Sequence, residues 1–192
     1  MQAKNDRCTP KNSNSSMLKQ TSRLSPKQRA ILTETFRKME DDGKRTGVNI
    51  FVRLFAEYPN YKAIWPQFQA IPDSSLMGAQ ELQKHAGVYM SGLRNIIASI
   101  DDNEALAEQL KKIALTHLKW GIRTFHIEVR NMLPEVLATV HLCMNGITPE
   151  VKDAWTTLFA VIASMVEDFR LDAEQKQNYR KGQGGLAGPV VK

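Results

Sequence analysis

Apolar residues recur along this chain at steps of three and four, the spacing that places them on one face of an α-helix. The segment SPKQ at residues 25–28 combines a capping box with proline at the first helical position, so we expect the first major helix to begin there. That helix should end at residues 41–43 (DDG), and a second should end at Pro59. Further helices are expected after Gly121 and from residues 148–149 (TP). No alternating strand pattern of useful length is present, so the sequence predicts an all-α domain.

Three prolines between residues 59 and 72 exclude any long regular element from that stretch. The same stretch carries Ile64, Trp65 and Phe68, which is much apolar surface for a loop. We therefore expect this loop to be held against something buried.

Two of the four histidines lie inside apolar helical stripes. One stripe contains Leu82, His85, Tyr89, Leu93, Ile96, Ile97 and Ile100, and the other contains Leu106, Leu110, Ile113 and His117. A single histidine on such a face is more often a core residue bonded to a backbone carbonyl. Two of them weaken that interpretation but do not by themselves overturn it. The alternative is that a metal ion satisfies both imidazoles and that one flat metal cofactor lies between the helices. The sequence has neither H-x-x-x-H nor C-x-x-C, which disfavours a tetrahedral zinc site.

The chain has 192 residues and 42% hydrophobic content, which suits one well-buried core. No apolar run approaches the roughly 20 residues needed to span a bilayer, so no transmembrane segment is expected. The first residues lack the apolar stretch of a secretory signal. Cys8 and Cys143 do not form a disulfide framework, and we expect a cytoplasmic protein.

The net charge of +6 is concentrated at the two ends. The first 23 residues hold five Lys or Arg and one Asp, and residues 174–192 hold four Lys or Arg and one Glu. Both ends contain low-complexity runs, NSNSS and GQGGLAGP. We expect a basic disordered extension over 1–23, a folded domain over 24–172 and a basic flexible tail over 173–192. Because the basic charge lies outside the folded body, a nucleic-acid partner is not expected.

Taken in order, these features resemble the globin family over residues 24–172. The motifs that carry the resemblance are LSPKQ, RLFAEYP, WPQF, LQKHAGVYM, LTHLKWGI and DAWTTLFAVIASM. The extended termini are similar to those of invertebrate, nematode-type neuronal globins with six-coordinate iron. The resemblance implies the three-over-three globin fold around a haem b and its iron, with His117 as proximal ligand and His85 on the opposite face.

The resemblance also shows where this chain departs from the usual globin pattern. Trp65 stands against the implied haem where globins nearly always have Phe, and Phe68 follows it. Phe51 fills the implied distal side without offering a hydrogen bond. Tyr89, four residues after His85, would crowd a diatomic ligand or donate a hydrogen bond to it.

The proximal side and the haem edge are less sharply defined by the resemblance. Ile113 and Ile122, before and after His117, complete the implied cofactor contacts. Val88 stands where a basic residue often reaches a haem propionate. The remaining candidates for that role are Lys84, Lys119 and Arg123.

A crowded distal side favours direct binding of His85 to the iron at rest. External ligands would then bind only the fraction of molecules in which His85 has moved away, and their apparent affinity would fall by that fraction. We therefore expect an oxygen sensor or a redox protein with an unidentified electron-transfer partner.

Three alternatives remain open at the level of sequence. They are reversible oxygen binding for storage, haem-dependent peroxidase or nitric-oxide chemistry, and a globin-shaped interaction module without haem. The two inward-facing histidines oppose the last of these. No Ser-His-Asp, paired-carboxylate or phosphate-loop arrangement points to a dedicated enzyme.

Overall fold

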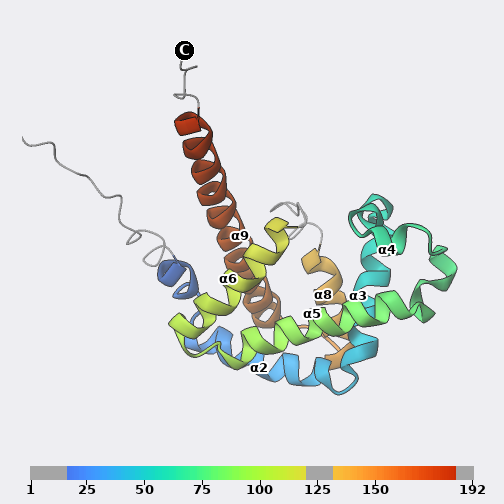
Figure 1. The fold of residues 1–192 in the computed structure, drawn as a ribbon. Coiled ribbons are helices and arrows are strands. Elements are labelled where there is room, and N and C mark those ends of the chain that lie inside the picture. Colours follow the sequence, from blue (N-terminus) through green and yellow to red (C-terminus); the bar gives the residue numbers. More distant parts are fainter. Residues whose placement is uncertain (1–16, 120–131, 185–192) are drawn as a thin grey trace, which may run out of the picture.

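The computed structural model describes residues 17–119 and 132–184 and is helical along most of this length (Figure 1). Its elements are α2 (Pro26–Glu40), α3 (Gly43–Glu57), η1 (Pro59–Ile64), α4 (Pro66–Gln69), η2 (Asp73–Gly78), α5 (Gln80–Ala98), α6 (Asn103–Lys119), α8 (Met132–Met144) and α9 (Pro149–Gly184). None of the described residues lies in a strand, which confirms the all-α prediction. No helix within the described ranges is long and apolar enough to cross a membrane.

The predicted start of α2 is present in full. The Ser25 hydroxyl accepts a hydrogen bond from the Gln28 backbone N–H at 3.2 Å, and the Gln28 side chain accepts one from the Ser25 N–H at 2.9 Å. This capping box satisfies two backbone donors that the first helical turn leaves free. At the other end, the chain turns at Asp41 and Asp42, and the Asp42 carboxylate caps α3.

The prolines act as predicted on the segment between α3 and α5. Only two short 3₁₀-helices, η1 and η2, and the four-residue α4 form there. Phe68 is completely buried and Trp65 is half-buried, so this segment is held against the body of the protein.

The helices pack in two layers, with α2, α5 and α6 in one and α3, α8 and α9 in the other (Figure 1). The most extensive contacts join α3 to α5, α6 to α9 and α2 to α9 across the layers. A glycine makes the first crossing close: a Cβ atom at Gly47 would lie 2.9 Å from Met90 Cγ and 3.0 Å from the Ala86 carbonyl oxygen. The missing side chain of Gly47 therefore sets the distance between α3 and α5.

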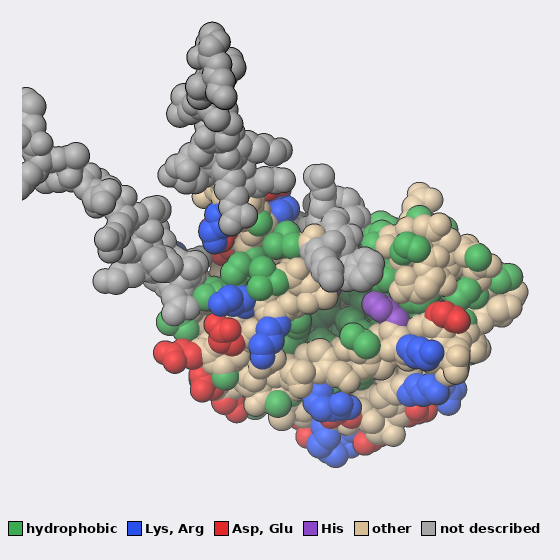
Figure 2. Space-filling model, in the orientation of Figure 1, with side chains coloured by type: hydrophobic (Ala, Val, Ile, Leu, Met, Phe, Trp, Pro, Cys, Tyr) green, Lys and Arg blue, Asp and Glu red, His purple; other side chains and the backbone are tan. Residues whose placement is uncertain are grey.

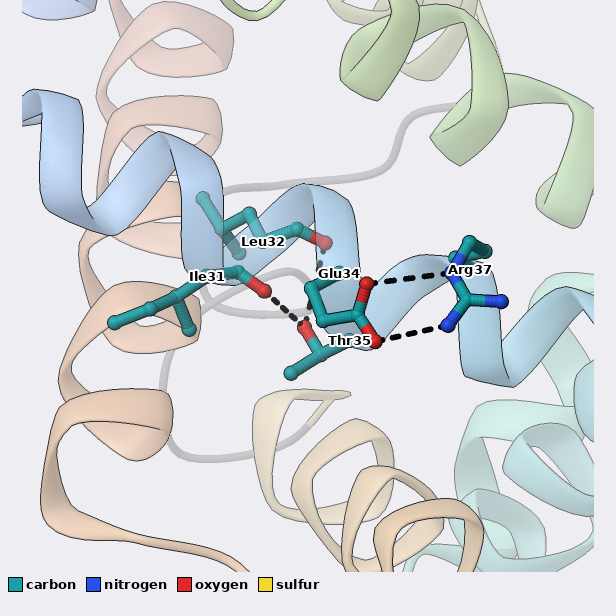
Figure 3. Close-up of polar contacts among 5 residues, drawn as sticks. All are labelled: Ile31, Leu32, Glu34, Thr35 and Arg37. Carbon is teal, nitrogen blue, oxygen red and sulfur yellow. Dashed lines mark hydrogen bonds and ion pairs between the residues drawn. The ribbon is translucent and has the colours of Figure 1, made fainter.

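Trp155 on α9 anchors the larger core cluster and is fully buried. Its indole N–H donates to the Thr35 hydroxyl at 3.0 Å. That hydroxyl donates in turn to the Ile31 carbonyl at 2.8 Å (Figure 3). A buried polar group is tolerated when it is paired in this way. The ion pair between Glu34 and Arg37, drawn in the same view, lies on the exposed side of α2.

Helical structure is present on both sides of residues 24–172. Residues 17–21 are helical, and Met17 and Thr21 are buried. The reason is the buried guanidinium of Arg29, which donates to the carbonyls of Thr21, Leu24 and Ile100 and to the Asn103 side chain. This network ties the N-terminal segment to the turn between α5 and α6.

At the other end, α9 continues as a helix to Gly184 and projects beyond the other helices (Figure 1). Residues 173–184 therefore form the last turns of α9. Ion pairs at helical spacing support it, from Arg170 to Glu167 and Glu174 and from Lys176 to Asp172.

Candidate functional site

A partly open cavity of about 470 Å³ lies between α5 and α6 and is bordered by residues of α3, α8, α9 and the segment after α3. Its wall is largely apolar, and Figure 2 shows a histidine at the edge of a hollow lined by hydrophobic side chains. The volume is in the range of about 300–1,000 Å³ that small-molecule and cofactor sites occupy. Both His85 and His117 line it, one from each helix.

His117 is held in a defined orientation by its own helix. Its Nδ1 lies 2.7 Å from the carbonyl oxygen of Ile113, one turn earlier on α6. Because a carbonyl can only accept, Nδ1 carries the proton and donates it, and Nε2 keeps a free lone pair. Burial lowers the pKa of His117, and the bond to Ile113 partly opposes that shift.

His85 is surrounded by aromatic rings. The centre of its imidazole lies 4.8 Å from that of Phe51, 5.3 Å from that of Trp65 and 5.5 Å from that of Phe68, all in edge-to-face geometry. Burial, and then the charge of His117, lower the pKa of His85 to about 4. Both imidazoles are therefore neutral near pH 7, which is the form that binds metals.

Tyr89 lies one turn after His85 on α5 and also lines the cavity. Its ring meets that of Phe51 edge-on, with centres 5.3 Å apart. Its hydroxyl is buried and has no hydrogen-bond partner among the described residues. An unpaired buried hydroxyl costs about 1–3 kcal/mol, and burial raises the pKa of Tyr89 well above its usual range.

The family model for globins matches residues 48–166, well over half of the chain. The chain belongs to the globin family. The matched span begins inside α3 and ends inside α9, so it includes both histidines and every described residue of the cavity wall. The predicted globin fold is thereby confirmed.

Globins from several animals are similar to this one. It is 26% identical to cytoglobin-1 of Oryzias latipes over 147 residues, 75% of this chain and 82% of the relative. It is 26% identical to a globin of Nerita albicilla over 159 residues, 80% of this chain and 94% of the relative. It is 29% identical to hemoglobin-3 of Phacoides pectinatus over 157 residues, 78% of this chain and 96% of the relative.

Most residues that the sequence analysis singled out for this globin meet at the cavity. Those in its wall are His85, His117, Phe51, Trp65, Tyr89 and Ile113. Phe68 stands behind the wall, completely buried, and reaches the site through its ring contact with His85. Ile122 lies outside the described residues.

The candidates for a cation at the cavity edge fare differently. Lys84 is exposed and lies outside the cavity wall. Arg123 and the side chain of Lys119 lie outside what the structure describes.

Sequence reasoning missed a polar edge of the globin cavity. Lys112 is the one Lys or Arg in the described wall, and Gln109 and Thr116 lie beside it on α6, with Asn95 facing from α5. A signal was present in the sequence. Gln109, Lys112 and Thr116 repeat at helical spacing, in a row that runs alongside the stripe containing His117.

Proposed function

We propose that this globin binds haem b in the cavity between α5 and α6, with His117 as the proximal iron ligand and His85 as the ligand on the other face. In this proposal the protein is a cytoplasmic oxygen sensor or electron-transfer protein of the six-coordinate, nematode-like type. The observation that carries the proposal is that two neutral imidazoles line one apolar cavity from two helices.

The donor set fits a haem better than a bare metal ion. Within the described residues, no group of three or more His, Cys, Asp and Glu is placed to hold a metal. Two imidazoles alone make an incomplete coordination shell, whereas a porphyrin brings four nitrogen ligands of its own and needs protein ligands only above and below. The bond from His117 to Ile113 is the outer contact that orients such a ligand and makes its Nε2 a better donor.

The polar edge of the cavity suits the haem propionates. The porphyrin face is apolar and matches a wall of Phe51, Leu54 and Ile113, but two carboxylates remain at its edge. The ammonium group of Lys112 would pair with one of them, and Asn95 and Gln109 would donate hydrogen bonds.

His85 is the residue that favours sensing or redox work over oxygen storage. The haem iron supplies reversible ligand binding and a one-electron change between ferric and ferrous states. The rings of Phe51, Trp65 and Phe68 restrict rotation of the His85 imidazole and keep it on the cavity side. A ligand that must displace it binds with an apparent affinity reduced by the fraction of molecules in which it is displaced.

The proposal is tested by absorption spectra of the full-length protein, reconstituted with hemin and recorded in the ferric and ferrous states. We expect a low-spin six-coordinate spectrum in both. His117→Leu should lose stable haem binding, because the proximal ligand is removed. His85→Leu should keep haem and show an open sixth site.

His141 provides a matched control because it is an exposed histidine on α8, outside the cavity wall. His141→Leu should leave the spectrum unchanged. A five-coordinate high-spin ferrous spectrum of the unmodified protein would refute binding of His85 to the iron and would favour oxygen storage. Failure to take up hemin at all would refute the haem site itself.

A further inference from the structure

Within the described part of the chain, Tyr89 holds the one buried side-chain polar atom without a hydrogen-bond partner. A phenylalanine would fill the same space without burying an unpaired hydroxyl. Buried polar groups in folded proteins are nearly always paired, and an exception asks for an explanation. The hydroxyl therefore points to a partner that the described part of the chain does not provide.

The position of Tyr89 indicates where such a partner would be. Tyr89 follows His85 by four residues on α5, and both side chains line the same cavity. The ring of Phe51 touches both of them, with centres 4.8 Å from that of His85 and 5.3 Å from that of Tyr89. Space vacated by the imidazole of His85 would thus border Phe51, beside Tyr89.

Tyr89 also has the right chemistry to act as a donor there. Its raised pKa keeps the hydroxyl protonated at physiological pH. Phe51 and Leu54, which share this part of the wall, have no polar side-chain atoms. Of the three described rings that contact His85, only that of Trp65 carries a donor, its indole N–H, and the His85 imidazole is a donor itself.

On the basis of the proposed function, we propose that Tyr89 donates the hydrogen bond to a diatomic ligand that displaces His85 from the haem iron. Tyr89 is then a residue that determines ligand specificity. A strong acceptor such as O₂ gains more from this bond than a weak acceptor such as CO, so Tyr89 favours O₂ over CO.

The test compares Tyr89→Phe with the unmodified full-length protein, both reconstituted with haem. In the CO complex, loss of a donor should raise the C–O stretching frequency in the infrared spectrum, because a donor near the oxygen weakens the C–O bond. O₂ should dissociate about tenfold faster from the variant, the loss expected for one hydrogen bond. The rate of CO dissociation should change much less.

The same measurements in a His85→Leu background separate Tyr89 from His85 as the donor. The effect of Tyr89→Phe should persist there, and Trp65→Phe should not reproduce it. The inference is overturned if Tyr89→Phe leaves both the C–O frequency and O₂ dissociation unchanged. It is also overturned if only His85→Leu or only Trp65→Phe moves them.

A second measurement does not depend on the bound haem. The haem-free Tyr89→Phe protein should unfold at the same or a higher urea concentration, because the hydroxyl has no partner among the described residues. A clear loss of stability would show that the hydroxyl has a structural partner and would overturn the inference. If neither the unmodified protein nor any variant binds hemin, the proposed function is refuted rather than the role of Tyr89.

Discussion

At His85, three aromatic rings stand where water would otherwise solvate a charged imidazole. The pKa of His85 falls from 6.5 to about 4 as a result. In the haem-free protein, this shift couples stability to pH. Between these two values the unfolded chain binds a proton that the folded protein does not bind, so protonation favours unfolding.

We therefore predict that the free energy of unfolding of the haem-free protein decreases as pH falls from 6.5 to 4. Above pH 6.5 the neutral His85 contributes about 3 kcal/mol to the free energy of unfolding, relative to strongly acidic solution. Most of this contribution is lost by pH 4. The lowered pKa of His117 acts in the same direction. Urea unfolding at a series of pH values measures the slope of the free energy of unfolding against pH.

Substitution at the same site checks the origin of this slope. His85→Gln should flatten it, because the titrating group is gone. Val88→Gln adds a polar group to the same cavity wall without a titrating proton and should leave the slope in place. An equally steep profile in His85→Gln would contradict the assignment to His85.

At the scale of elements, the crossing of α3 and α5 determines how far the rings on α3 stand from the histidine on α5. Gly47 permits the close approach, since a Cβ there would lie 3.0 Å from a backbone oxygen on α5. Backbone cannot turn aside as a flexible side chain can, so the two helices must separate to admit a methyl group.

Gly47→Ala is predicted to destabilise the protein by up to about 2 kcal/mol. Alanine favours the helix by about 1 kcal/mol, but overpacking at a tight contact costs about 1–3 kcal/mol. Gly87→Ala on α5 is the matched control, because a Cβ there meets nothing within 4 Å and should stabilise the helix. Urea unfolding of both full-length variants decides the question, and equal stability of the two would rule out the close contact.

Sequence periodicity predicted the elements well where a cap or a stripe was strong. The SPKQ cap fixed the start of α2, and the two histidine stripes placed His85 and His117 on facing helices. Periodicity failed where polar side chains, through hydrogen bonds or ion pairs, stabilise the structure. Arginine is usually a surface residue, yet Arg29 is buried. The end of α9 has no apolar stripe to reveal it, and ion pairs support this part of the helix.

The candidate site shows the same division. Periodicity identifies which residues face inward, so Phe51, Tyr89 and Ile113 could be named in advance. The row of Gln109, Lys112 and Thr116 beside the His117 stripe was visible in the sequence, but periodicity does not show that such a row reaches a cavity. That depends on the packing of α6 against α5. The role of Gly47 could not be predicted from the sequence either, because it depends on contact with a helix almost forty residues away in the chain.

At the scale of the whole molecule, Arg29 joins three parts that are distant in sequence. Its guanidinium holds the N-terminal segment, α2 and the turn between α5 and α6 through hydrogen bonds. It forms no ion pair with a carboxylate in the described ranges, so backbone and amide oxygens alone satisfy its charge.

Arg29→Met is predicted to lower the free energy of unfolding by about 2–3 kcal/mol, because buried carbonyls lose a charged donor. Amide hydrogen exchange over residues 17–24 should accelerate, since this segment loses its attachment. Arg23→Met removes an arginine from the same segment whose contacts are exposed, and should have a small effect. Equal effects of both substitutions would contradict a special role for Arg29. Haem uptake should survive, because Arg29 lies outside the cavity wall.

The indole of Trp65 in the cavity wall gives the molecule a built-in optical reporter. A porphyrin beside an excited indole takes up its energy without radiation, so emission from Trp65 would fade as the cavity fills and return as it empties. Trp155 donates to Thr35 in the other core cluster, and the same energy transfer would reach it, because Phe159, one turn later on α9, lines the cavity. Tryptophan fluorescence can thus follow the loading of the cavity directly.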